Sequence, residues 1–299
     1  EILIEYGTKY QKDKFLKLLL EGKIRSCFSM TEPNHAGSNP VFMSTTAIKK
    51  NDSYLINGRK WYTSSAEGSS FAIVMAISNP NEKNKYLTAS QIIVPTDLIG
   101  FNLIRKIPVM GEEGEGYFSH SEIEYNNVTV PKENLLGKEG FGFKIAQSRL
   151  GPGRIHHCMR WIGICERSFD MMCERAASRE LSPGNFLGQK QLIHKMIAER
   201  RVEINAAKLL VMDVGRKIEK QGSKESRFDI SMIKFYCANI LKIVIDDAIQ
   251  IHGGLGMSDD IILSHFYRHE RAARIYDGAD EVHITNVAKG VLSKYGLKI

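Results

Sequence analysis

A carboxylate near the end of the sequence, Asp277, stands between an aromatic residue and a glycine in the stretch Tyr276-Asp277-Gly278. Such a carboxylate can act as a general base if its oxygen comes within about 2.6–3.2 Å of the atom that loses the proton. Two plainer interpretations are open: an Asp-Gly pair is a common turn signal, and an Asp before a helix can cap that helix. The helix is expected over 281–294, and Asp280 is placed better than Asp277 to cap it.

Four segments upstream have residue types suited to holding a bound group. They are Thr31-Glu32-Pro33, Ala36-Gly37-Ser38, Lys60-Trp61-Tyr62-Thr63 and Gln250-Ile251-His252-Gly253-Gly254. Small residues let backbone N–H groups approach a phosphate, and a planar cofactor ring needs hydrogen-bonding partners at its edge. Each segment alone also has an ordinary explanation, such as a Pro/Gly loop, a strand Trp in a core, or a glycine helix stop.

The order and separation of these segments resemble the acyl-CoA dehydrogenase flavoproteins, from about Gly7 to Val291. The resemblance implies FAD bound non-covalently between a β-domain and a helical bundle. It implies contacts to FAD from Phe28, Met30, Thr31, Gly37, Ser38, Trp61, Thr63, Arg179, Gln250, Gly253 and Gly254.

Within that set, the resemblance places the Met30 backbone and the Thr31 hydroxyl at the pyrimidine edge of the flavin and the indole of Trp61 beside its rings. It places the Thr63 hydroxyl at the hydride-accepting nitrogen. Arg179 and the segment from Gln250 would reach the FAD of a neighbouring subunit, although Arg179 can also be an exposed helix residue. The chain departs from the family in two loops, each one residue longer than usual, at 34–35 and 179–191.

The same resemblance assigns the catalytic base to Asp277, a supporting cation to Arg154, and substrate contacts to Tyr276 and Gly278. Most of the family has Glu at the base position, so the side chain here is one methylene shorter. Some members carry the base on the residue before the Arg, but Gly153 occupies that place and has no carboxylate.

The implied reaction is FAD-dependent α,β-dehydrogenation of an acyl-CoA thioester, as in fatty acid β-oxidation. Asp277 would take the α-proton, the β-hydride would go to the flavin, and an electron-transferring flavoprotein would accept the electrons. Two alternatives stay open: an acyl-CoA oxidase that uses oxygen, and a truncated, non-catalytic remnant. The resemblance also implies a homodimer or homotetramer in a mitochondrion or peroxisome.

The elements that would position these residues change in kind along the chain. Apolar spacing predicts an amphipathic helix over 8–23 that stops at Gly22. Short apolar or alternating runs at 71–77, 91–94, 101–107 and 120–130 predict strands, and Asn57-Gly58 predicts a hairpin turn.

Long helices are expected over 141–178, 186–220 and 227–252, with breaks at Gly222 and at the later glycine pair. The stretch 151–154 is expected to open a helical run.

This order predicts an α+β multidomain fold, with a central β-barrel or sandwich followed by an antiparallel four-helix bundle. The predicted domains are 1–24, the last helix of an N-terminal helical domain, then 25–131, the β-domain, and 132–299, the bundle. Helices do not alternate with strands, which excludes a Rossmann or TIM-barrel fold. The first residues lack a Met and a signal peptide, so a fragment or truncated isoform is expected.

The bulk composition is that of an ordinary globular protein, with 43% hydrophobic and 25% charged residues among 299. No apolar run reaches the roughly 18 residues that span a bilayer. The net charge of +7 favours an anionic partner, but the basic residues are dispersed and no nucleic-acid motif occurs. The acidic stretch 111–116 predicts an exposed turn and not a phosphate loop.

The five cysteines include no CxxC pair, and their spacing predicts buried, reduced thiols and a reducing compartment. His265 and His269 have the i, i+4 spacing of a metal pair, but no third ligand lies near them in sequence. The sequence therefore disfavours a zinc site.

Overall fold

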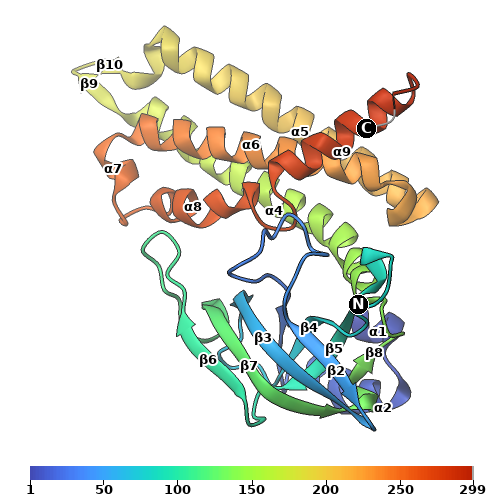
Figure 1. The fold of residues 1–299 in the computed structure, drawn as a ribbon. Helices are drawn as coiled ribbons and strands as arrows, with labels where there is room; N and C mark the ends of the chain where they lie inside the picture. Colours follow the sequence, from blue (N-terminus) through green and yellow to red (C-terminus); the bar gives the residue numbers. More distant parts are fainter. Residues whose placement is uncertain (298–299) are drawn as a thin grey trace. The chain divides into compact units, whose positions relative to one another are not determined.

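The computed structural model describes residues 1–297 and divides into two compact units, residues 1–149 and the residues from 150 onward. Figure 1 shows that strands dominate the first unit and helices the second. The α+β fold class is thus as predicted, whereas the domain boundaries proposed at 24/25 and 131/132 remain predictions. Helix α4 (Gly142–Ser178) runs across the division at residue 149.

The first unit contains short helical segments followed by a mixed sheet. The helical segments are α1 (Ile2–Tyr6), α2 (Lys9–Gln11), the π-helix η1 (Lys12–Leu16), α3 (Lys17–Leu20), and the 3₁₀ turns η2 (Lys85–Leu87), η3 (Gly116–Phe118) and η4 (Lys132–Asn134). The strands are β1 (Ser26–Ser29), β2 (Thr46–Lys50), β3 (Ser53–Ser64), β4 (Phe71–Ile77), β5 (Ala89–Pro95), β6 (Phe101–Lys106), β7 (His120–Pro131) and β8 (Leu135–Leu136).

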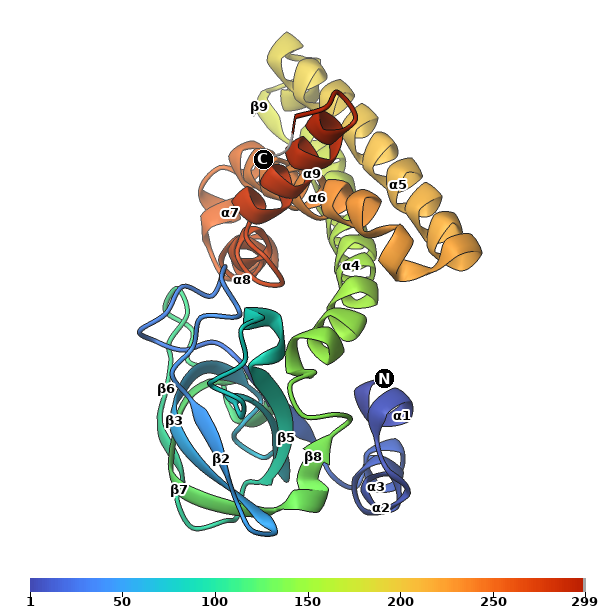
Figure 2. The same ribbon diagram turned by 45° about the vertical axis from the view of Figure 1, so that its right-hand side comes forward.

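The eight strands form one sheet in the order β6-β7-β3-β2-β4-β5-β8, with β1 paired to β4. The pairs are antiparallel except β1 with β4 and β2 with β4, which are parallel. Figure 2 shows the strands curving around one another, although the pairings do not close into a barrel. Strands β4 and β5 are buried on both faces, since a core inside the sheet packs on one side and the N-terminal helices on the other.

The predicted N-terminal helix is confirmed in outline. The segments α2, η1 and α3 follow one another without a gap, and Gly22 ends them with φ +68°. Thr8 and Gln11 form a capping box at the start, and the ring of Phe15 packs 4.8 Å from that of Phe71.

The hairpin turn predicted at Asn57-Gly58 is wrong. Strand β3 continues through both residues, and the hairpin turn lies instead between Lys50 and Ser53. The pairing of β3 with β7 shifts register at Gly58, which has φ +149°. The Asn-Gly pair therefore marks a β-bulge where the backbone of Thr45 approaches closely.

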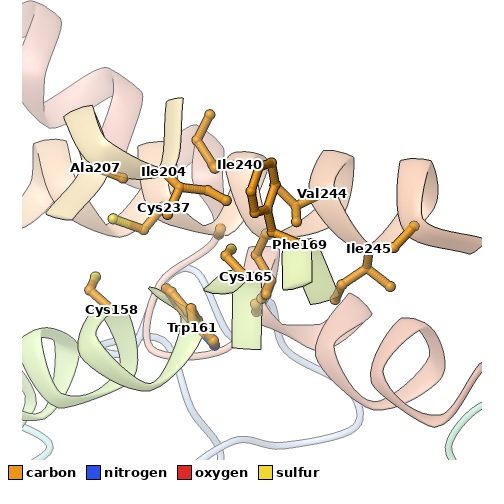
Figure 3. Close-up of a cluster of buried hydrophobic side chains, with 14 of the residues drawn as sticks. Cys158, Trp161, Cys165, Phe169, Ile204, Ala207, Cys237, Ile240, Val244 and Ile245 are labelled. Atoms are coloured by element: carbon orange, nitrogen blue, oxygen red, sulfur yellow. The ribbon is translucent and has the colours of Figure 1, made fainter. Parts of the chain in front are cut away.

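The second unit is a helical assembly. Its elements after α4 are β9 (Glu180–Ser182), β10 (Asn185–Phe186), η5 (Leu187–Gln189), α5 (Gln191–Glu225), α6 (Arg227–His252), α7 (Gly254–Met257), α8 (Leu263–Glu270), η6 (Arg271–Arg274) and α9 (Asp280–Ser293). Figure 3 shows the core formed by the facing sides of three long helices, with Trp161 and Phe169 from α4, Ile204 from α5, and Ile240 and Val244 from α6.

Several helix boundaries differ from the predictions. Helix α5 begins at Gln191 and not at 186, because a short β9–β10 hairpin occupies the preceding residues. The break at Gly222 is confirmed, since its φ of +83° is not helical. The 151–154 stretch does not open a helix but lies inside α4, which tolerates Pro152.

The five cysteines are free thiols, as predicted, and four of them are buried, whereas Cys173 is only half-buried. Burial raises the pKa of the Cys27 thiol to about 12, which keeps it protonated and unreactive at neutral pH.

We expect Gly58→Ala to destabilise the first unit by about 2–4 kcal/mol, because of strain and overpacking. A Cβ at this position would lie 2.4 Å from Thr45 Oγ1 and 2.6 Å from Thr45 Cα. Gly111→Ala is the matched control: its φ is +89° but no atom lies within 4 Å, so about 1 kcal/mol is expected. Urea unfolding, followed by Trp61 fluorescence in a Trp161→Phe background, measures the free energy of unfolding of both variants. Equal losses of this free energy in Gly58→Ala and Gly111→Ala would contradict the close approach of Thr45 to Gly58.

Candidate active site

The backbone of the loop 276–278 has an unusual conformation. Asp277 has φ +53° and Gly278 has φ +100°, so two successive residues lie in or near the left-handed region. Asp tolerates this region better than most residues, yet it is still strained there. The turn interpretation of the Asp-Gly pair is therefore correct, and it is compatible with a catalytic role.

Two donors meet the carbonyl oxygen of Asp277. Arg154 Nε on α4 donates to it at 2.8 Å, and His283 Nε2 on α9 lies 3.2 Å from it. A carbonyl only accepts, so Nε2 of His283 carries the proton, while its Nδ1 faces Ser231 Oγ at 3.2 Å. Burial, and after it the charge of Arg154, lowers the pKa of His283 to about 4, so the ring is neutral at physiological pH.

A buried lysine holds the other end of the loop. Lys234 on α6 donates from Nζ to the carbonyl of Ala273 at 2.8 Å and to that of Gly278 at 2.6 Å. Burial lowers the pKa of Lys234 to about 8, and the nearby carboxylates of Asp280 and Asp277 partly oppose this shift. A cation of the protein thus fixes the carbonyls on both sides of the loop.

The side chain of Tyr276 is anchored as well. Its hydroxyl oxygen accepts from Trp161 Nε1 at 3.2 Å and from Arg160 at 3.1 Å. Arg160 also binds both carboxylate oxygens of Glu270. Although burial opposes it, bonds from His269 and Arg160 lower the pKa of Glu270 to about 2, so this carboxylate is ionised.

The carboxylate of Asp277 has an imidazole beside it. Nε2 of His157 lies 3.1 Å from Oδ2 of Asp277, and both side chains are partly shielded from solvent. The ring of His157 stacks on Trp161 at 5.8 Å between centroids and lies 4.9 Å from the ring of Tyr276. His157 was not predicted from the sequence, although it follows Arg154 by three residues on one helix face.

Asp280 does not cap α9, contrary to the sequence prediction. The N-cap residue is Ala279, and no side chain makes a capping hydrogen bond there. Asp280 is instead buried and accepts from Arg274 Nε at 2.6 Å and Asn239 Nδ2 at 3.0 Å. The carboxylate of Asp280 therefore binds Arg274 and Asn239 and does not bind the free N–H groups at the start of the helix.

In the first unit, a reciprocal pair of bonds ties the predicted flavin-binding segments together. The backbone N–H of Trp61 donates to Thr31 O at 3.0 Å, and Thr31 Oγ1 donates to Trp61 O at 3.0 Å. Lys60 Nζ donates to Met30 O at 2.8 Å and to Glu32 Oε1 at 2.9 Å. These contacts hold the 30–32 segment against β3.

Glu32 and Lys60 form a buried ion pair that sequence analysis did not assign. Burial alone would raise the pKa of Glu32, but Lys60 and the backbone amides of Ser44 and Thr45 outweigh it and lower that pKa. Burial lowers the pKa of Lys60 to about 8, against the opposing effect of Glu32. The pair fixes the start of the exposed loop that contains Gly37 and Ser38.

The predicted cofactor residues Trp61 and Thr63 do not share a face of β3. A register shift between Lys60 and Thr63, with φ +49° at Tyr62, changes the alternation of the strand. Trp61 is half-buried, whereas Thr63 is fully buried and its hydroxyl shares a 3.1 Å hydrogen bond with Ser29. A flavin contact by this hydroxyl would have to share the Ser29 bond.

The other predicted cofactor residues differ in their surroundings. Phe28 packs on the core between the sheet and the N-terminal helices. Arg179, directly after α4, and Gln250, near the end of α6, are exposed. Gly253, with φ +63°, ends α6, and Gly254 begins α7, so the glycine pair acts as a helix stop as predicted.

Residues 1–297 contain no cluster of three or more His, Cys, Asp or Glu side chains that could hold a metal ion. Among the described helices, none is long and apolar enough to cross a bilayer.

Comparison with known proteins supports the resemblance. Residues 27–128 match the family model of the acyl-CoA dehydrogenase middle domain, and residues 140–292 match that of the acyl-CoA dehydrogenase C-terminal domain. The chain therefore belongs to the acyl-CoA dehydrogenase family.

Individual relatives agree with this assignment. The chain is 44% identical over 98% of its length to the probable acyl-CoA dehydrogenase FadE2 of Mycobacterium tuberculosis, and covers 72% of that protein. It is 42% identical over its whole length to acyl-CoA dehydrogenase family member 11 of Gallus gallus, but spans only 39% of that longer chain. The butyryl-CoA dehydrogenase structure from Megasphaera elsdenii matches 97% of this chain with a TM-score of 0.87 at 30% identity, and the match covers 74% of the bacterial chain.

The low pKa of His283 predicts a pH-dependent stability. Between about pH 6.5 and pH 4 the unfolded chain binds a proton at this ring that the folded chain does not, so lowering the pH through this window destabilises the fold. Glutamine does not titrate, so the free energy of unfolding of His283→Gln should fall by roughly 2–3 kcal/mol less than that of wild type across this window. Urea unfolding at several pH values measures it, with exposed His156→Gln as control, and parallel pH curves for wild type and His283→Gln would refute it.

Proposed function

We propose that this chain catalyses the α,β-dehydrogenation of an acyl-CoA thioester, with Asp277 as the base. Membership of the family supports an oxidoreductase that acts on acyl-CoA with FAD as its cofactor. The observation that carries the residue assignment is the loop 276–278, whose strained backbone is anchored by Arg154 and Lys234. A strained turn held by a buried lysine and a half-buried arginine is typical of a site where one side chain must be placed accurately.

In the proposed reaction the carboxylate of Asp277 takes the α-proton of the thioester. Arg154 and His283 hold the carbonyl of Asp277, and Lys234 holds that of Gly278, so the base and the adjacent backbone amides keep their position while the proton moves. When bound, FAD supplies the acceptor for the β-hydride. Loss of one proton and one hydride leaves a double bond between the α- and β-carbons.

The cofactor would contact the first unit at Met30, Thr31, Gly37, Ser38 and Trp61. The Thr31 hydroxyl uses its proton on Trp61 O but keeps acceptor capacity for a flavin N–H, so it fits the group. A Cβ on Gly37 would lie 3.3 Å from the Thr31 side chain, so a larger residue would crowd the loop here. Exposed backbone with small side chains suits a pyrophosphate.

The partners follow from the same assignment. The substrate is an acyl-CoA, Tyr276 and Gly278 lie beside it, and an electron-transferring flavoprotein takes the electrons. In a homodimer or homotetramer, Arg179, Gln250, Gly253 and Gly254 reach the FAD of a neighbouring subunit, which agrees with their exposure. A mitochondrial or peroxisomal location belongs to this proposal.

The purified full chain should show the visible absorption of oxidised flavin. Ser38→Glu should lower FAD retention at least tenfold, because a carboxylate near the pyrophosphate repels it. Ser70→Glu, an exposed serine of the same unit, is the matched control and should retain FAD. A colourless protein that binds no added FAD would contradict the proposal.

Asp277→Asn should lower the rate of anaerobic flavin reduction by about 10³-fold or more, with FAD still bound, because the amide cannot accept the α-proton. Asp277→Glu keeps the carboxylate but moves it, so a loss of about tenfold or more is expected. Stopped-flow absorbance with saturated acyl-CoA thioesters of several chain lengths measures both. Turnover at the wild-type rate in Asp277→Asn would exclude this residue as the base.

A further inference from the structure

We propose that His157 is a positioning residue for the reaction, and that its imidazole sets the orientation of the Asp277 carboxylate. This inference rests on the proposed function, since it concerns how the assigned base is held. His157 would not touch the substrate; it would act through Asp277.

Helix α4 contacts both the backbone and the side chain of Asp277. Arg154 Nε donates to the Asp277 carbonyl at 2.8 Å, and one turn later His157 Nε2 lies 3.1 Å from Oδ2 of the same residue. Residues three apart on a helix share a face. One rigid element therefore fixes two separate points of the base, which leaves its χ angles little freedom.

The imidazole is itself restrained. Trp161, one turn further along α4, stacks on it at an interplanar angle of 21°, and the ring of Tyr276 packs at 56° with centroids 4.9 Å apart. Trp161 and Tyr276 are in turn joined by a 3.2 Å hydrogen bond. A ring held on two sides by aromatic groups offers its nitrogen in a fixed direction, which a freely rotating surface histidine cannot do.

The orientation of one carboxylate oxygen determines the position of the other. With Oδ2 3.1 Å from Nε2 of His157, rotation of the carboxylate about its Cβ–Cγ bond is restricted, and so is the direction from which its other oxygen would approach the α-proton. A misplacement of about 1 Å in such a group can lower a rate by about 10²-fold. His157 is therefore expected to affect the chemical step and not substrate binding.

Other charged groups lie around the contact between His157 and Asp277. They are Arg154 and Arg160 on α4, Lys234 on α6, Glu270 at the end of α8, and Asp280 and His283 on α9. None of these groups is altered in the variants below, which change only His157, Asp277 or the control residue His156.

The kinetic test compares three variants of the FAD-loaded full chain. His157→Leu should lower the maximal rate of anaerobic flavin reduction by about 10- to 100-fold, with KM for the acyl-CoA changed less than about threefold. His157→Gln retains an N–H donor near the Nε2 position and should recover most of the rate. His156→Leu, at the exposed preceding position, is the matched control and should equal wild type.

A second measurement needs neither FAD nor turnover. The imidazole NMR resonances of His157, assigned by their loss in His157→Gln, are compared at one pH in wild type and in Asp277→Asn. Because Nε2 of the ring lies 3.1 Å from Oδ2 of Asp277, these resonances should move in Asp277→Asn, whereas those of the exposed His156 should stay unchanged.

The outcomes separate the two proposals. If Asp277→Asn reduces flavin as fast as wild type, the assigned base is wrong, whatever His157 does. If Asp277→Asn is inactive but His157→Leu matches wild type, the positioning role is overturned while the base assignment stands. An equal loss of rate in His157→Leu and His157→Gln, or His157 resonances that do not move in Asp277→Asn, would also overturn the positioning role.

Discussion

The left-handed turn at Asp277 and Gly278 depends on donors from helices far away in the sequence. Arg154 on α4 and Lys234 on α6 donate to the carbonyls of the two residues. An L-residue in this conformation costs on the order of 1–3 kcal/mol, and a buried carbonyl without a partner costs a similar amount. The turn therefore persists only because the long helices present their cations at these points. The hydrophobic core that aligns α4 with α6 is thus also what positions the carboxylate.

Stability alone does not account for cations in these places. Burial lowers the pKa of Lys234 to about 8, which is the sign of a charge that would be more favourable in water. Buried charges are often no more stabilising than apolar residues of the same size, but removing one partner is expensive. The same reasoning applies to Lys60 and Glu32 beside the 30–32 segment, where burial also lowers the pKa of Lys60 to about 8. In each unit, taken by itself, a buried lysine fixes nearby backbone carbonyls, which indicates that the lysine specifies a local conformation.

The sequence predicts the kinds of element well because apolar periodicity directly reflects which faces are buried. It fails at the bulges, since the register shift at Gly58 depends on how closely Thr45, the residue before β2, approaches. The sequence also does not predict the role of Lys234, because its partners are backbone carbonyls some forty residues further along the chain. Every residue has such a carbonyl, so the residue types do not indicate which ones Lys234 binds. Among the site residues that were not predicted, His157 was the easiest to find from the sequence, because its spacing from Arg154 and Trp161 places all three on one face of α4.

For the proposed base, the use of Asp instead of Glu is a matter of geometry more than of acidity. The ordinary pKa values of the two side chains, about 3.9 and 4.3, differ too little to change the strength of the base. Asp has one fewer rotatable bond, so fewer orientations remain to be excluded, but its reach is shorter by one methylene. For the proposed role the backbone must bring Asp277 closer to the substrate, and in this chain Arg154 holds the backbone carbonyl of Asp277 while His157 lies 3.1 Å from its carboxylate. A shorter side chain in the proposed role would tolerate less movement of the loop than a longer one would. The proposed use of Asp at this position would therefore be coupled to Arg154 and His157 on α4.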